Sequence, residues 1–367
     1  MERKTRVGIY ERIEQYRKRP LVVYATSTRQ NVPAQMAGDA VREFIDQLDA
    51  IKTFKEVDIL IHSTGGDALV AWKLMSMIRE RFERVAVLVP FMAFSAATMF
   101  ALGADQIVMH PNASLGPIDP QIAAQNPEGR QRNFAYEDLG AFLRFLGDEV
   151  GITEQEHLTD VVEKLFSVSD PLTIGAARRA SDLSTQVGER LLSMHMDLKS
   201  DREKARQIAL NLNKSFFAHG DAISRKRARE LELKIAEDDV ELETEIWQAF
   251  LGLEAYMQLR SPFQPLEHFV SDPAAAQTLA PRGALNLPAN APPQIQQQAW
   301  QVAVNAAIQN AQGQAPEVPY SVVNAVIESV RATTEFRSTG TISAFRKPDG
   351  NVQISLVVRE SGWRSVT

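Results

Sequence analysis

The sequence predicts an α/β protein whose core is a mostly parallel β-sheet covered by helices. Two kinds of segment alternate between residues 21 and 109: short runs rich in Val, Ile and Leu, which are typical of buried strands, and longer runs with apolar residues at helical spacing. Parallel strands must be joined by a crossover, and a helix is the usual one. The alternation therefore favours a parallel sheet with helices on both faces.

Each expected element has its own signal in the sequence. A charged segment with helical spacing of its apolar residues, 1–20, precedes the first strand. The expected strands are β-branched and apolar, at 21–25, 57–62, 85–89 and 106–109. The expected helices are amphipathic or rich in small residues, at 37–48, 67–82 and 95–102. A polar loop is expected at 124–133, followed by a helical extension over 136–213 and a basic helix at 224–233.

Composition excludes several classes of protein. The chain has 367 residues, enough for one large core with a smaller module, and its formal net charge of −6 argues against nonspecific nucleic-acid binding. It contains no cysteine, which excludes disulfides, thiol nucleophiles and cysteine-ligated zinc. We predict no cofactor and no metal site.

Residues 85–104 carry no charge and are long enough on that ground to cross a membrane. Pro90 lies inside this stretch, and the composition changes there from β-branched to small residues, which favours a strand followed by a buried helix. The N-terminus lacks the apolar core of a signal peptide. We therefore expect a cytoplasmic protein without an integral membrane segment.

Ser95 stands where a nucleophile would be built. It opens the small-residue helix that follows the strand at 85–89, so its hydroxyl lies beside unpaired backbone N–H groups and the positive end of the helix dipole. That setting stabilises a developing oxyanion. Gly65 and Gly66 follow the preceding strand, and two adjacent glycines let the backbone approach a ligand and present N–H groups to it. The pattern predicts acyl chemistry.

Three motifs together resemble the serine dehydrogenase proteinase family, which is related to signal peptide peptidase A and more distantly to the proteolytic subunit of Clp protease. They are HSTGG at 62–66, FSAAT at 94–98 and MHPNASLGPIDPQ at 109–121. The resemblance covers roughly residues 20 to 240, and LGPIDPQ is its most specific part. It implies a Clp/crotonase-type fold and assembly into a homo-oligomer.

By the same resemblance Ser95 is the nucleophile, and the N–H groups of Gly66 and Ala96 form the oxyanion hole. An extended peptide substrate is expected to add as a strand beside the glycine pair, against Thr64 and Gly65. The sequence departs from the family here. The family has two glycines after the serine and a proline before the glycine pair, where this chain has Ala96, Ala97 and Thr64. The backbone N–H groups remain in place.

A serine hydroxyl is a weak nucleophile without a base. Signal peptide peptidase A and its closest relatives use a lysine some way after the serine, but this chain has no lysine between Lys73 and Lys164. Asp119 follows Ser95 at nearly the distance of the catalytic histidine in the Clp proteolytic subunit, so this resemblance implies a carboxylate near the serine. We predict a triad of Ser95, His219 and Asp119, in which His219 takes the hydroxyl proton and Asp119 orients the imidazole.

The roles of these residues leave alternatives open. Asp119, between two prolines, fits a turn as well as a catalytic carboxylate, and His219 fits an ordinary structural or surface histidine as well as a base. His62, at a strand end, and Lys214, on a helix, are further candidate bases. Packing is the competing interpretation for His62, and a solvated helix face for Lys214.

The C-terminal third differs in composition. We place a peptidase domain at 1–258 and a Pro/Ala/Gln-rich linker at 259–325, with one short helix expected at 299–310. A β-hairpin module follows at 326–367, because two apolar runs flank the turn sequence Pro-Asp-Gly-Asn at 348–351.

We expect an ATP-independent serine endopeptidase that cleaves extended or unfolded polypeptides. A noncatalytic scaffold that recruits a partner through its tail is the alternative, and the missing lysine and the altered glycines favour it. An acyl-CoA-handling relative is a third candidate, against which the serine at the helix start argues.

Overall fold

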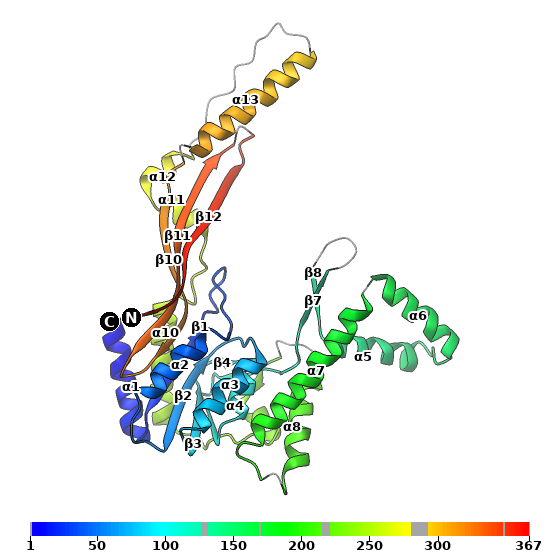
Figure 1. Cartoon of the computed structure of the whole chain (residues 1–367), viewed down its shortest axis with the longest axis vertical. Coiled ribbons are helices and arrows are strands. Elements are labelled where there is room, and N and C mark those ends of the chain that lie inside the picture. The colour runs from blue at the N-terminus through cyan, green and yellow to red at the C-terminus, as the bar shows by residue number, and fades with distance from the viewer. Residues whose placement is uncertain are drawn as a thin grey trace. The chain divides into compact units, whose positions relative to one another are not determined.

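The computed structural model describes residues 2–125, 131–168, 170–197, 199–214, 221–279, 293–313, 315–347 and 349–366 (Figure 1). The chain divides into two compact units. The first consists of Met1–Thr26, Gln35–Leu253 and Ile327–Thr333, and the second consists of Ser27–Ala34, Glu254–Val326 and Thr334–Thr367. Each unit has its own apolar core, so each is described separately.

The first unit contains a parallel sheet with the strand order β1-β2-β3-β5. Its strands are β1 (Leu21–Thr26), β2 (Glu56–His62), β3 (Arg84–Val89) and β5 (Gln106–Met109). β1 is buried along its whole length, and β2 and β3 are buried beyond their first residues, as expected of strands covered on both faces. The predicted α/β class with a mostly parallel sheet is confirmed.

Helices connect and cover these strands in the predicted order. They are α1 (Arg3–Arg17), α2 (Ala40–Asp49), α3 (Ala68–Arg79) and α4 (Ala96–Leu102). α3 begins at a capped terminus, because the Asp67 side chain accepts a hydrogen bond from the Leu69 amide at 2.8 Å. α4 is buried at every position, which matches its content of small and apolar residues.

The uncharged stretch 85–104 forms nearly all of β3 and the buried helix α4, as predicted, with the short strand Met92–Ala93 between them. In the part of the chain that the structure describes, no helix is both long enough and apolar enough to cross a membrane.

A helical extension follows the sheet. Its elements are α5 (Tyr136–Arg144), the π-helical turn η1 (Phe145–Glu149), α6 (Gln155–Val168), α7 (Pro171–Leu192), α8 (Arg202–Lys214), α9 (Arg225–Glu230) and α10 (Val240–Met257). α7 and α8 approach closely, since a Cβ on Gly188 would lie 3.2 Å from the Cβ of Ala209. The segment expected as a polar loop instead contains two short antiparallel strands, β7 (Ile122–Gln125) and β8 (Gln131–Phe134).

The second unit is built on long strands. β11 (Thr333–Arg346) and β12 (Val352–Ser365) form the predicted antiparallel hairpin, and β10 (Val318–Glu328) is the neighbour of β11. The range expected as a linker also contains α11 (Pro265–Val270), α12 (Pro273–Gln277) and α13 (Pro293–Gly313). Phe269 and Ile342, both fully buried, are central to the apolar core of this unit.

Candidate active site

Ser95 occupies the junction between β4 (Met92–Ala93) and α4. Its backbone has φ 50° and ψ −117°, a conformation that is rare for a residue with a side chain and destabilises the chain by about 1–3 kcal/mol. Ser95 is the N-cap residue of α4, yet in the described structure its side chain makes no capping hydrogen bond. The residue is partly exposed. The hydroxyl therefore lies at the helix start without being used by the helix.

The glycine turn after β2 lies directly against Ser95. Gly65 has φ +103°, and a Cβ on it would lie 2.8 Å from the Cβ of Ser95 and 2.9 Å from the amide nitrogen of Ala96. Both distances are shorter than real Cβ contacts. Only a residue without a side chain lets the turn and the helix start come this close.

The edge of the turn is fixed by Met36. The Met36 amide donates to the Gly65 carbonyl at 2.7 Å, and the Asp67 amide donates to the Met36 carbonyl at 3.0 Å. Gly66 lies between these two bonds with φ +147°, where a Cβ would lie 2.3 Å from the Met36 carbonyl oxygen. Among the described residues, the backbone N–H groups of Gly66 and Ala96 donate no hydrogen bond to the protein. Neither donor is used within the described protein, although Ala96 is buried and Gly66 is only partly exposed.

Ser63, which the sequence reasoning did not single out, links the glycine turn to the Ser95 segment. Its buried hydroxyl accepts a hydrogen bond from the Gly65 amide at 3.0 Å and one from the Thr26 hydroxyl at 2.7 Å. Its carbonyl accepts from the Phe94 amide at 3.0 Å. Ser63 thus positions Gly65 from one side and Ser95 from the other.

Thr98 is the second residue that sequence reasoning missed. Its hydroxyl is buried on α4, lies 2.6 Å from the Ala93 carbonyl oxygen, and accepts a hydrogen bond from the Gly116 amide at 3.0 Å. β4 also pairs in parallel with β6 (Ser114–Leu115). These bonds hold the LGPIDPQ segment, residues 115–121, beside the start of the Ser95 helix.

Asp119 is nearly buried within that segment. Its carboxylate accepts a hydrogen bond from the Gln121 amide group at 2.9 Å. The neighbouring Ile118 amide donates to the carbonyl of Leu212 on α8 at 3.0 Å, and the Ser184 hydroxyl of α7 donates to the Ile118 carbonyl. The helical extension therefore holds the segment that carries Asp119.

His219, the predicted base, lies outside the described residues. The chain is described on both sides of it, and both sides attach to the same segment. Leu212 accepts the bond from Ile118, and Ile223 of β9 (Ile223–Ser224) pairs with Leu115 of β6. The last described residue of α8, Lys214, has its ammonium nitrogen 3.9 Å from a carboxylate oxygen of Glu137 and is partly exposed.

His62 is packed in an aromatic cluster. Its ring centroid lies 5.0 Å from that of Phe250 and 6.1 Å from that of Phe91. Burial lowers the pKa of His62 to about 4, so the ring is neutral near pH 7. This environment fits packing, the competing interpretation of His62, better than a role as base.

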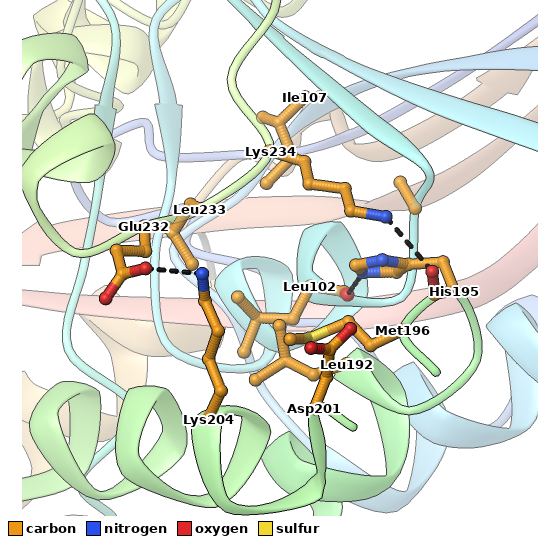
Figure 2. A pocket seen from close by; sticks show the side chains of 11 residues that line it. Leu102, Ile107, Leu192, His195, Met196, Asp201, Lys204, Glu232, Leu233 and Lys234 are labelled. Carbon is orange, nitrogen blue, oxygen red and sulfur yellow. Dashed lines mark hydrogen bonds and ion pairs between the residues drawn. The ribbon is translucent and has the colours of Figure 1, made fainter. Parts of the chain in front are cut away.

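A partly open pocket of about 130 Å³ lies at the opposite end of α4 from Ser95, and Figure 2 shows its lining. His195 Nε2 lies 2.9 Å from the carbonyl oxygen of Leu102, the last residue of α4, and the Lys234 ammonium donates to the His195 carbonyl at 3.0 Å. Because α4 has seven residues, it separates the pocket from Ser95 by about 10 Å along its axis. The pocket is distinct from the candidate site.

Comparisons with known proteins agree with the resemblance seen in the motifs. Residues 31–130, which include the glycine turn, Ser95 and LGPIDPQ, match the family described as ClpP-like SDH-type serine proteinase. Two uncharacterized proteins of Methanocaldococcus jannaschii, MJ1495 and MJ0137, are 28% and 27% identical over 49% and 53% of this chain. The matched parts are 51% and 58% of those proteins, so the chain spans only about half the length of these relatives.

Among solved structures, a variant of the 1510-N membrane-bound stomatin-specific protease matches 57% of this chain and 79% of its own, with 15% identity and a TM-score of 0.34. ClpP1 from Listeria monocytogenes matches 63% of this chain and 97% of its own, with 14% identity and a TM-score of 0.33. The segment that holds the glycine turn, Ser95 and LGPIDPQ is thus similar in sequence to the ClpP-like SDH-type serine proteinases.

Proposed function

We propose that this chain is a serine peptidase that hydrolyses peptide bonds of extended polypeptides through Ser95. One observation carries the proposal: Ser95 is held with a positive φ at a helix start, directly against a double-glycine turn, inside the segment that matches a serine proteinase family. A strained residue at a ligand-accessible turn is typical of an active site. The proposed peptidase needs no ATP and acts in the cytoplasm.

In the first step the Ser95 hydroxyl attacks the carbonyl carbon of the scissile peptide bond. The negative charge that forms on the carbonyl oxygen is stabilised by the N–H groups of Gly66 and Ala96, which have no other acceptor among the described residues. The N-terminus of α4 adds its positive dipole end at the same place. Loss of one such donor typically reduces the rate by about a hundredfold to a thousandfold.

We assign the proton transfer to His219, with Asp119 as its partner. His219 is four residues before Ile223 in the sequence, and four residues span at most about 14 Å. Ile223 pairs with Leu115, four positions before Asp119. Chain connectivity therefore supports His219 as the partner of Asp119. His219 takes the proton from Ser95 and later gives it to the leaving amine, while Asp119 fixes the tautomer of the ring.

The substrate is proposed to bind as an added strand along the glycine turn. Thr64 is exposed there and Gly66 is partly exposed, whereas Gly65 is buried against the start of α4. Main-chain hydrogen bonds would supply affinity for any extended peptide, which suits a peptidase that acts on unfolded chains.

Labelling of the full chain with a fluorophosphonate probe tests the proposal. We expect covalent modification at Ser95, loss of labelling in Ser95→Ala and His219→Ala, and normal labelling in Ser200→Ala, an exposed serine far along the chain. Hydrolysis of an unfolded protein substrate should likewise be lost in Ser95→Ala and His219→Ala and remain normal in Ser200→Ala. A folded chain that neither labels nor cleaves would instead support the noncatalytic scaffold, which the absence of a lysine between Lys73 and Lys164 favours.

A further inference from the structure

The partly open pocket at the far end of α4 has an aliphatic floor. Aliphatic groups that face unfilled space lose packing contacts, and a cavity of about 150 Å³ with such a lining admits benzene. The pocket, at about 130 Å³, therefore has room for an aliphatic side chain of about four carbons. Five of its lining residues are apolar and at most 6% exposed: Leu102, Ala104, Ile107, Leu192 and Leu233.

Four charged side chains share the lining with this floor (Figure 2). Lys204 and Glu232 form an ion pair, so their charges cancel. In the described part of the chain, Lys234 and Asp201 form no ion pair. The Lys234 ammonium donates to the His195 carbonyl at 3.0 Å, and the Asp201 carboxylate accepts a hydrogen bond from one backbone amide at 3.3 Å. Lys234 is exposed and Asp201 is partly exposed, so one cation and one anion can meet a ligand.

His195 adds a third polar group to the lining. Its Nε2 lies 2.9 Å from the Leu102 carbonyl oxygen, and because a carbonyl only accepts, Nε2 carries the proton. Burial lowers the pKa of His195, so the ring is neutral near pH 7 and Nδ1 is an acceptor. Nδ1 is buried, and no described residue donates a hydrogen bond to it. An ammonium group bound beside the ring would supply that donor.

The backbone that carries these groups is held by hydrogen bonds of the fold. The Ile107 amide donates to the Lys234 carbonyl at 2.9 Å, and the Ala236 amide donates to the Ile107 carbonyl at 2.8 Å, so the segment with Lys234 is attached to β5. Asp201 directly precedes α8, and Leu102 ends α4. A site whose backbone is already ordered loses little conformational entropy when a ligand binds.

We propose that this pocket binds a free α-amino acid with a branched aliphatic side chain, such as leucine. The side chain occupies the aliphatic floor, the carboxylate pairs with Lys234, and the ammonium group pairs with Asp201 and donates to His195 Nδ1. Taken as a sphere, the pocket is only about 6 Å across, so one small ligand can reach groups on different walls.

The charges favour a zwitterion over a singly charged ligand. A simple carboxylic acid would leave Asp201 without a cation, and a simple amine would leave Lys234 without an anion. Hydrogen bonds between charged partners are stronger than neutral ones, so a ligand that carries both charges gains two of them.

Isothermal titration calorimetry of the full chain with leucine tests the proposal. We expect saturable binding of leucine. Binding should weaken by about tenfold or more for isocaproate, which lacks the ammonium group, and for isoamylamine, which lacks the carboxylate. Glycine lacks the aliphatic side chain and should bind at least tenfold more weakly than leucine. Absence of leucine binding, or equal binding of isocaproate or isoamylamine, would overturn the proposal.

Two charge-removing variants locate the ligand in the pocket. Lys234→Met and Asp201→Asn each keep roughly the shape of the side chain, and each should weaken leucine binding by about tenfold or more. The matched controls are Lys226→Met and Asp160→Asn, at exposed residues outside the lining, and these should bind leucine like the unmodified chain. Circular dichroism confirms that all four variants are folded. Unchanged leucine affinity in folded Lys234→Met or Asp201→Asn would contradict the proposed site.

Leucine binding is independent of the proposed peptidase activity, because the pocket and Ser95 lie at opposite ends of α4. Ser95→Ala should therefore bind leucine with unchanged affinity while it loses fluorophosphonate labelling. Loss of leucine binding in folded Ser95→Ala would place the ligand at Ser95 and overturn the assignment to this pocket.

Discussion

Gly65 and Ser95 are packed so closely that a methyl group on Gly65 would lie 2.8 Å from the Cβ of Ser95. The same methyl group would lie 2.5 Å from the Phe94 carbonyl oxygen, which is backbone and has little freedom to move. The conformation of Ser95 therefore requires that residue 65 has no side chain.

Gly65→Ala should damage both stability and the site. Alanine at φ +103° is strained, and its Cβ displaces the start of α4, so we expect a loss of ~2 kcal/mol or more in the free energy of unfolding. Urea denaturation measures the stability, and fluorophosphonate labelling measures the site. The control is Gly175→Ala on α7, where a Cβ meets nothing within 4 Å and alanine should stabilise the helix by about 0.5–1 kcal/mol. Equal stability of the two variants would contradict the packing described.

Thr98→Val keeps the shape of the side chain and removes the buried hydroxyl. The Gly116 amide then keeps only its 3.3 Å bond to the Ala93 carbonyl, and the Ala93 and Gly116 carbonyls lose the hydroxyl donor, which should lower the free energy of unfolding by ~1–3 kcal/mol. Thr159→Val on α6 is the control, since that hydroxyl is exposed and bonds only to the Gln155 carbonyl of its own helix. If the two valine variants unfold alike in urea, Thr98 does not anchor the LGPIDPQ segment.

Stability should depend on pH through His62. Burial lowers the pKa of His62 to about 4 in the folded chain, whereas an unfolded histidine titrates near 6.5. Between those values the unfolded state binds more protons, so stability falls as the pH drops from about 6.5 to 4, by up to roughly 3 kcal/mol. His62→Phe preserves the ring stack with Phe91 and Phe250 and removes the titration. Urea midpoints of the two chains, measured from pH 7 to pH 4.5, should diverge; parallel curves would show that His62 titrates normally.

A buried ion pair should make Glu328 sensitive to substitution. The Arg6 guanidinium donates two hydrogen bonds to the Glu328 carboxylate, at 2.8 and 2.9 Å, with both side chains almost fully buried, and the Tyr10 hydroxyl donates to the same group. Glu328→Gln leaves a buried cation without its counter-charge, which should lower the free energy of unfolding by about 3 kcal/mol.

The matched control for this pair is Glu245→Gln, whose partner Arg12 lies at the surface with half of its side chain exposed. Removal of an exposed pair of this kind changes stability by ~1 kcal/mol at most. Similar urea midpoints for Glu328→Gln and Glu245→Gln would mean that the buried pair contributes no more to stability than the exposed pair.

The central sheet was predictable because its strands are continuous apolar runs separated by helices, a local signal that needs no knowledge of the fold. The C-terminal hairpin was predictable for the same reason, from the turn sequence at 348–351. Within 259–325 the sequence predicts only one helix, at 299–310, because its Pro/Ala/Gln-rich composition favours a linker, whereas the structure has α11, α12 and α13 there. Pro265 and Pro273 instead occupy the first turns of α11 and α12, where a missing N–H group does no harm.

The glycine turn and Ser95 were located from sequence, since each is formed by a short motif of consecutive residues. The residues that hold them were not. Ser63 and Thr98 bond to backbone groups brought close only by the fold, and Arg6 pairs with Glu328 across 322 positions of sequence. His62 shows the same limit: its surroundings come from Phe91 and from the distant Phe250, so burial of the ring could not be inferred from its strand end alone.

The left-handed backbone at Ser95 lowers the stability of the fold at the same residue that carries the reactive hydroxyl. Glycine would adopt the same torsion angles without steric penalty and would leave a better-folded molecule, but it would have no oxygen to offer. A serine at residue 95 therefore supplies a hydroxyl that folding does not need, in a conformation that lowers the stability of the chain.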